Sequence, residues 1–265
     1  MEILVGFLIA ATVGLTGIGG GSFTTPALVL LAGLPAAEAV GTAMIFSAAL
    51  RILAAPFYVI RKQIHGRYLG LLLLGAVPGL LVGTWLLHFM YVESYKSGLL
   101  LVVGIILTLS SAISFLPKLQ KPQFARTRSH WLSLLALPIG VETGISSAGA
   151  GALGTMLMLN FSEMSAAQVV GTDILFGIVL AFVGGAFHLL WGSIDSPVLV
   201  RLLIGGVPGV LTGCVLAHKI DGHKLRTVIA SIAILLGLQL VWSGVQGHIK
   251  AQRTAAKLTQ RVGLR

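Results

Sequence analysis

Long apolar stretches separated by short polar connections fill almost the whole chain. Eight of them are long enough to be membrane helices, at roughly residues 3–32, 36–60, 68–90, 97–116, 131–160, 165–191, 198–218 and 224–245. A helix needs about 20 apolar residues to cross the hydrocarbon core of a bilayer. The pattern therefore predicts an all-α, polytopic membrane protein, and it leaves little chain for a soluble catalytic domain.

The second half of the chain repeats the first half. Ala36–Thr42 recurs as Ala166–Thr172 and Val77–Gly83 as Val207–Gly213, each 130 positions later. This predicts two repeats of four segments, at 1–116 and 131–246, with a basic connecting loop at 117–130 and a basic tail at 247–265. Matched glycine and proline interruptions in two hydrophobic halves are typical of secondary transporters, whose substrate lies near the interface of the halves.

The charge of the chain fits a membrane surface better than a nucleic acid. Only 10% of residues are charged and the mean hydropathy is +0.96, while the formal net charge is +10. The basic residues gather after segments two and four and in the tail, where they would meet anionic lipid and fix the topology. Membrane lipids are thus expected partners and nucleic acid is not. Cys214 is the only cysteine, which excludes an intramolecular disulfide.

The first and fifth segments are each interrupted by glycines. Segment one has about 30 residues, which as one helix would measure roughly 45 Å, more than the core of a bilayer. The run Gly17–Ser22 (GIGGGS) is unfavourable inside a helix, and Gly144–Gly154 repeats the problem in segment five. We therefore expect both segments to be broken or re-entrant. Four crossings per half would give parallel repeats, and three crossings plus a hairpin would give inverted repeats. Charge favours the first alternative and length the second.

The interrupted segments supply most of the candidate substrate-binding residues. A broken helix exposes backbone N–H groups that carry partial positive charge and can face an anion. The alternative is that small residues only let helices pack closely. The candidates are Gly19, Gly20, Gly21, Ser22, Thr24 and Thr25 in the first half, and Ser146, Ser147, Gly149 and Gly151 in the second.

Three further candidates lie inside predicted spans. Thr42 and Thr172 end the repeated Val-Gly-Thr and could bind substrate or only bond a helix carbonyl. Arg51 is the one cation well inside a predicted span. It could attract an anion, pair with Asp173 or Glu142, or extend to the membrane surface.

Coupling or gating is assigned to residues whose presence in a membrane is costly. A carboxylate there costs roughly 2.5–3.5 kcal/mol on insertion scales, and so Asp173 and Glu142 are functional candidates, the alternative being a structural bond to a neighbouring element. His188 could titrate near neutral pH or be a hydrogen-bonded edge residue. Pro78 and Pro208 could be hinges or static kinks.

The same motifs resemble those of the TauE/SafE sulfite exporter family. The resemblance rests on Gly17–Pro26 (GIGGGSFTTP), Val-Gly-Thr at 40–42, and Pro-Gly followed by Gly83, and in the second half on 149–151 (GAG), 170–173 (VGTD), His188 and 207–209 (VPG). It covers roughly residues 5–245. It implies a bacterial inner-membrane permease for sulfite, sulfonates or other sulfur-containing organic anions. Two features depart from the family pattern: Ala43 stands where relatives often repeat the acid of Asp173, and the second glycine run is diluted at 146–151.

The leading hypothesis is therefore a secondary transporter of a small anion, which needs no cofactor. Coupling to protons or sodium and an oligomeric assembly stay open. An intramembrane enzyme is the first alternative, but the sequence has no HExxH or Gly-x-Ser-x-Gly motif and no Walker motif. The second alternative is a membrane assembly or sensor subunit, against which the repeated helix breaks argue.

Overall fold

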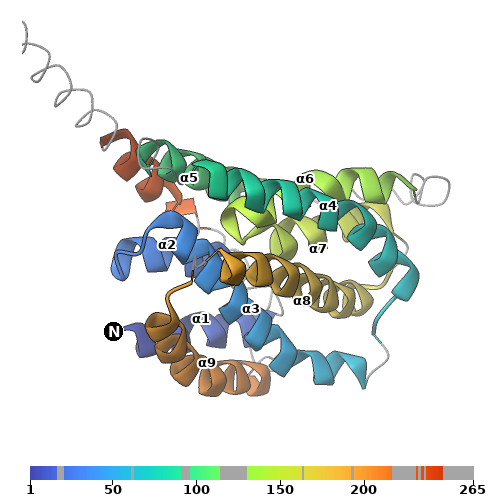
Figure 1. The fold of residues 1–265 in the computed structure, drawn as a ribbon. Helices are drawn as coiled ribbons and strands as arrows, with labels where there is room; N and C mark the ends of the chain where they lie inside the picture. The colour runs from blue at the N-terminus through green and yellow to red at the C-terminus, as the bar shows by residue number, and fades with distance from the viewer. Residues whose placement is uncertain are drawn as a thin grey trace, which may run out of the picture.

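The chain folds into a bundle of helices, shown in Figure 1, in a computed structural model. The structure describes residues 1–16, 21–60, 63–90, 96–113, 130–162, 164–191 and 194–216, together with 231, 234–235 and 237–246. No strand occurs in these ranges. The helices are α1 (Glu2–Thr16), α2 (Gly21–Leu31), α3 (Ala36–Val59), α4 (Gly66–Met90), α5 (Lys96–Ile113), α6 (His130–Ser146), α7 (Gly149–Phe161), α8 (Ala166–Leu190) and α9 (Ser196–Leu216).

The fifth predicted segment is two helices. In the first segment, α1 ends at Thr16 and α2 begins at Gly21, and residues 17–20 lie outside the described ranges. Segment five is interrupted between Ser146 and Gly149, giving α6 and α7. Four helices are long and apolar enough to cross a membrane, within α3, α4, α8 and α9, and Glu2–Leu15 and Trp131–Ser146 are shorter apolar helices. The described residues thus give an all-helical membrane protein in which α1 and α6 are shorter than a full span.

Two helix pairs hold the halves together through glycines, which allow close backbone contact. α4 packs along α6, with Gly75, Gly79 and Gly83 facing the backbone of Ser133, Leu137 and Val141. α9 packs along α1 in the same way, with Gly205, Gly209 and Gly213 facing Ile3, Phe7 and Ala11. Each of the six residues in this second contact lies 130 positions from its counterpart in the first contact. The first helix of each half therefore packs, in parallel, on the fourth helix of the other half.

α3 and α8 lie between these pairs, as Figure 1 shows, and cross each other in opposite directions. Gly184 of α8 faces Met44 and Gly177 faces Arg51, so that positions rise along α3 as they fall along α8, and Gly171 faces Gln63 in the segment after α3. In their spanning windows, 67% and 61% of residues are buried, against 39% for α4 and α9. The central pair is therefore shielded by protein, while α4 and α9 present side chains such as Trp85 and Val215 on the outside.

Candidate functional site

The break between α6 and α7 depends on an unusual backbone conformation at Ser147. Its φ is +64°, in the left-handed region that residues other than glycine rarely adopt. Its backbone N–H still donates to the Thr143 carbonyl at 2.8 Å. Ala148 then precedes α7 with no side-chain cap on its first turn. The Ala148 N–H donates to the Ser146 hydroxyl at 3.2 Å. The first turn of α7 receives no cap from its own N-cap side chain, and the start of a helix favours a negative ligand.

A threonine of the first half contacts this break directly. Thr25 of α2 is fully buried, and its hydroxyl lies 2.7 Å from the Ser147 hydroxyl and donates to the Ser146 carbonyl at 3.1 Å. A hydroxyl has one proton, and so when Thr25 donates to Ser146, Ser147 donates to Thr25. The candidate residues Thr25, Ser146 and Ser147 are thus brought together across the halves.

Other candidates in the two breaks are placed less completely. Gly19 and Gly20 lie outside the described residues, as does the Ser22 side chain, while Gly21 begins α2 and Thr24 is buried there. Gly149 begins α7, and the Gly151 N–H donates to the Ala148 carbonyl at 3.3 Å. Their binding roles stay predictions.

Arg51 and Asp173 form a second cluster, at the crossing of α3 and α8. They are only 5% and 1% exposed, and the Asp173 carboxylate is the charge that acts on the Arg51 guanidinium. The guanidinium lies over Gly177, one helical turn from Asp173, at a place where any Cβ would overlap Nη1. Arg51 Nε is buried and has no hydrogen-bond partner within the described ranges. The structure therefore brings together a cation and an acid that were one of several pairs expected from the sequence.

Thr42 and Thr172 make matching contacts between the halves. The Thr42 hydroxyl accepts a hydrogen bond from the Asp195 N–H, and the Thr172 hydroxyl accepts one from the His65 N–H, both at 3.0 Å. The two donors are 130 positions apart in the sequence, and so are the two acceptors, so that the second contact repeats the first. Both threonines are fully buried. These hydroxyls fasten the start of α9 and of α4 to the opposite half, and a role in substrate binding stays a prediction.

The remaining coupling candidates are spread out. Glu142 is buried on α6, one turn before Ser146, whose hydroxyl donates to the Glu142 carbonyl at 3.0 Å. His188 is buried near the end of α8, and neither ring nitrogen has a hydrogen-bond partner in the described part of the chain. Pro78 and Pro208 lie inside α4 and α9, next to Gly79 and Gly209, which are among the glycines through which α4 packs on α6 and α9 packs on α1. Gating by these residues stays a prediction.

Two residues of the site escape the sequence reasoning, namely Gly154 and Gly177. A Cβ on Gly154 of α7 would lie 2.9 Å from Asp173 Oδ1, and Gly177 makes room for Arg51. The signal for both is a difference between the repeats: the first half has Thr24 and Ser47 at these positions. Searching for places where the halves differ would have found them.

Buried polar residues at helix breaks, apolar helices of spanning length and contacts that join two repeated halves define a multi-pass membrane transporter. The chain belongs to the TauE/SafE sulfite exporter family, whose members are transporters and not enzymes: the family model described as "Sulfite exporter TauE/SafE" matches residues 2–240.

Two proteins of Bacillus subtilis (strain 168) are similar over almost their whole length. "Probable membrane transporter protein YjnA" is 30% identical over 251 residues, covering 90% of this chain and 98% of that protein. "Probable membrane transporter protein YdhB" is 29% identical over 246 residues, covering 91% and 99%. No solved structure matches the chain.

Proposed function

We propose that this transporter carries a small anion, most simply sulfite, a sulfonate or another sulfur-containing organic anion, between its two repeats. The observation that carries the proposal is the helix break at Ser147, whose hydroxyl contacts Thr25 of the other half, just before the start of α7, where Ala148 supplies no side-chain cap. Such a site offers donors to an anion and changes geometry if the halves move relative to each other. The family description names sulfite, which fits this donor chemistry.

The helix directions support an inverted relation between the repeats. α3 and α8 are equivalent in the sequence repeat, yet they pack antiparallel. Halves of opposite orientation can alternate between outward-open and inward-open states by exchanging conformations around one fixed site. In this proposal α1 with α2, and α6 with α7, form hairpins that enter the membrane without each crossing it fully.

The binding chemistry relies on neutral donors supported by one buried cation. The start of α7 carries about half an elementary positive charge. Ser147 can turn its proton from Thr25 toward an anionic oxygen, because Thr25 still donates to the Ser146 carbonyl. Arg51 supplies the full positive charge at the centre of the bundle. Oxygens of a sulfite or sulfonate group accept several such bonds at once.

The test is uptake by the full chain in proteoliposomes, using a panel of radiolabelled sulfite, methanesulfonate, sulfoacetate and taurine. Ser147→Ala removes a donor to the anion, and Thr25→Val removes the hydroxyl that holds Ser147 and the Ser146 carbonyl in place. Because a hydrogen bond to a charged group contributes about 1.5–3 kcal/mol, Ser147→Ala should weaken the apparent affinity by about 10-fold or more. Thr25→Val should also weaken it, because the break loses its contact with the other half. Thr212→Val is the matched control, since Thr212 is exposed on α9 and, among the described residues, its hydroxyl bonds its own helix, at Pro208 and Gly209.

The outcome separates several possibilities. Uptake of one panel anion that is lost in both variants and kept in the control supports the site. If only Arg51→Gln affects uptake, the hydroxyl and backbone site is wrong. If no panel anion enters the vesicles, the proposed substrate class is wrong.

A further inference from the structure

The repeat provides two equivalent places for a charged pair, and only one of them is occupied. Asp173 on α8 corresponds to Ala43 on α3, and Arg51 on α3 corresponds to Ala181 on α8. The helices cross close to Arg51, so that the acid of one half and the cation of the other fall at the same place. The opposite place holds two alanines. The charged pair is therefore a specific feature of one side of the interface.

The surrounding residues are adapted to this pair. Gly154 leaves room for the Asp173 carboxylate and Gly177 leaves room for the Arg51 guanidinium. At the equivalent positions of the first half, where there is no charge to accommodate, the chain has the larger Thr24 and Ser47. Four positions thus change together between the halves. A chance acid in a helix would not be expected to come with two such clearances.

The guanidinium keeps donor capacity that the described residues do not use. It has five N–H donors, and a carboxylate engages two of them in its best geometry. Nε is buried and has no hydrogen-bond partner among the described residues. A buried donor without an acceptor is costly, and an anionic ligand would satisfy it.

Charge balance then restricts how an anion can bind. One buried cation and one buried carboxylate are neutral together, and adding a monoanion would leave a net negative charge in a medium of low dielectric constant. The balance is restored if the carboxylate takes up a proton from water. The neutral carboxyl is then attracted less strongly to the guanidinium, and the anion can replace it beside Arg51.

We propose that the transported anion binds Arg51 in exchange for Asp173, and that Asp173 takes up one proton as it leaves, so that each anion is accompanied by one proton. This rests on the proposed anion transport and adds the coupling ion. In the step, the electrostatic attraction between Arg51 and the ionised carboxylate is lost, and hydrogen bonds and an ion pair between Arg51 and the anion form. One proton from the aqueous phase forms an O–H bond on Asp173.

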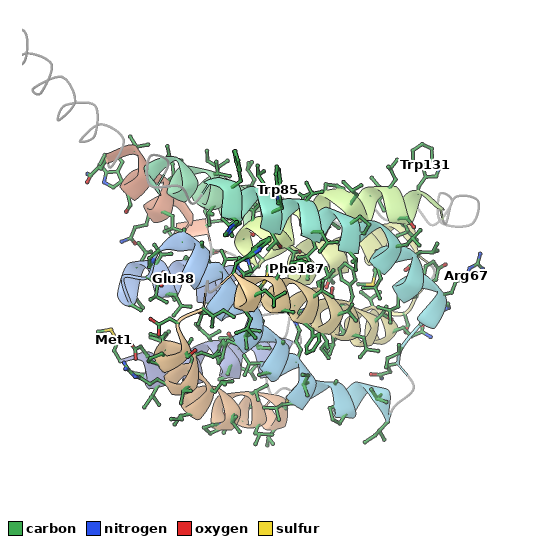
Figure 2. The ribbon with its side chains drawn as sticks, in the orientation of Figure 1. Met1, Glu38, Arg67, Trp85, Trp131 and Phe187 are labelled. Atoms are coloured by element: carbon green, nitrogen blue, oxygen red, sulfur yellow. The ribbon has the colours of Figure 1, made fainter. Side chains whose placement is uncertain are left out.

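The other titratable groups lie on the elements that pack against α8, and α8 itself also carries His188 near its end. α7 (Gly149–Phe161) contains none in its sequence, and α3 carries Arg51, Tyr58 and, at its far end, Glu38. The segment before α4 brings His65 beside Thr172, and α4 itself carries Arg67, Tyr68 and His88. Figure 2 shows Arg67 pointing away from the bundle and Glu38 on the opposite side of the molecule. α6 carries His130 and Glu142.

The experiment follows proton movement and anion movement in the same vesicles. Proteoliposomes of the full chain contain a pH-sensitive dye and receive a gradient of methanesulfonate, a strong-acid anion that carries no proton itself. Sulfite uptake is measured in parallel. We expect about one proton per methanesulfonate, and an apparent affinity that falls about 10-fold per pH unit once Asp173 holds no proton. Methanesulfonate uptake without proton movement would overturn the inference while leaving the proposed function intact.

Variants identify the group that takes the proton. Asp173→Asn should bind methanesulfonate with a pH-independent affinity and carry no proton, whereas Arg51→Gln should lose binding. Asp195→Asn is the control acid, because Asp195 caps the start of α9 through the Val198 N–H at 2.9 Å. Proton movement retained in Asp173→Asn would overturn the assignment. The wild-type stoichiometry decides the main point even if a variant fails to fold. If neither methanesulfonate nor any other panel anion is taken up, the proposed function fails, and with it the exchange that rests on it.

Discussion

Ser147 combines a left-handed backbone with a buried hydroxyl that contacts the other half of the molecule. A residue with a side chain costs about 1–3 kcal/mol in such a conformation, and such strain gathers at functional sites. The equivalent residue of the first half in the sequence is Gly17, and glycine in general adopts positive φ at little cost. The second half therefore accepts backbone strain and gains a hydroxyl at the centre of the candidate site.

Substitution of Ser147 should separate strain from function. We expect Ser147→Gly to keep the thermal stability within about 1 kcal/mol, because relief of strain offsets the lost hydrogen bond. We expect Ser147→Val to lose about 1–3 kcal/mol, since a β-branched residue fits this backbone poorly. Unfolding in detergent measures both. Anion uptake should fall in Ser147→Gly despite its stability, and normal uptake there would exclude the hydroxyl from the site.

The clearance at Gly154 can be tested by making the second half resemble the first. Gly154→Thr alone places a Cβ 2.9 Å from Asp173 Oδ1 and should destabilise the protein. The double variant Gly154→Thr with Asp173→Ala reproduces the Thr24 and Ala43 combination and should regain stability, with a coupling energy of about 1–3 kcal/mol. Additive losses in a double-mutant cycle would show that the two residues do not share one space. Transport should stay lost in the double variant.

At the scale of elements, the rows of glycines on α4 and α9 let each of these helices pack against the first helix of the opposite half. Gly79 and Gly209 immediately follow Pro78 and Pro208, and both α4 and α9 continue through their prolines. The glycine of each Pro-Gly pair contacts a neighbouring backbone, at Leu137 or Phe7. These contacts give the Pro-Gly pairs a packing role, and a hinge role for the prolines remains a prediction.

A single glycine substitution should reveal this packing. Gly79→Ala would drive its Cβ into the Leu137 carbonyl and force α4 and α6 apart, and we expect a loss of about 1–3 kcal/mol. Gly70→Ala, in the same helix, meets nothing within 4 Å and should be neutral or slightly stabilising, because alanine favours the helix. The melting temperatures of the two purified variants provide the comparison. Equal melting temperatures would mean that α4 and α6 do not touch at Gly79.

At the scale of the whole molecule, antiparallel packing of α3 and α8 assigns the loops to two sides. The start of α8 lies near the segment before α4, through Thr172 and His65. The start of α3 lies near the segment before α9, through Thr42 and Asp195. The basic residues Arg61 and Lys62 flank the first of these groups in the sequence, and because basic loops favour the cytoplasm we expect this group on the cytoplasmic side.

Labelling of single cysteines tests this arrangement. In a background with Cys214→Ser, we expect Gln63→Cys and Ser165→Cys to react with an impermeant maleimide from the cytoplasmic side. Pro35→Cys and Ser196→Cys should react from the opposite side. Labelling of whole cells and of inside-out vesicles distinguishes the two. If Gln63→Cys and Ser165→Cys react from different sides, the halves are parallel and the inverted arrangement is wrong.

Much of this protein is determined by local sequence. The extents of α3, α4, α8 and α9 agree with the predicted segments to within a few residues, because the length of an apolar run is a local property. The break at 147–148 was likewise predictable, since glycines and serines weaken a helix wherever it packs. The family follows from motifs along the chain.

Only the tertiary structure decided which residues meet. The sequence left parallel and inverted repeats open, offered Arg51 several partners, and gave Thr42 and Thr172 no partner in the opposite half. The observed contacts join residues more than 100 positions apart, as Thr25 and Ser147 do, and no local pattern encodes them. They depend on helix direction and on close approach at glycines such as Gly177. Hydrophobic length determines that a helix forms, whereas the fit of its faces against others determines which polar groups share the buried site.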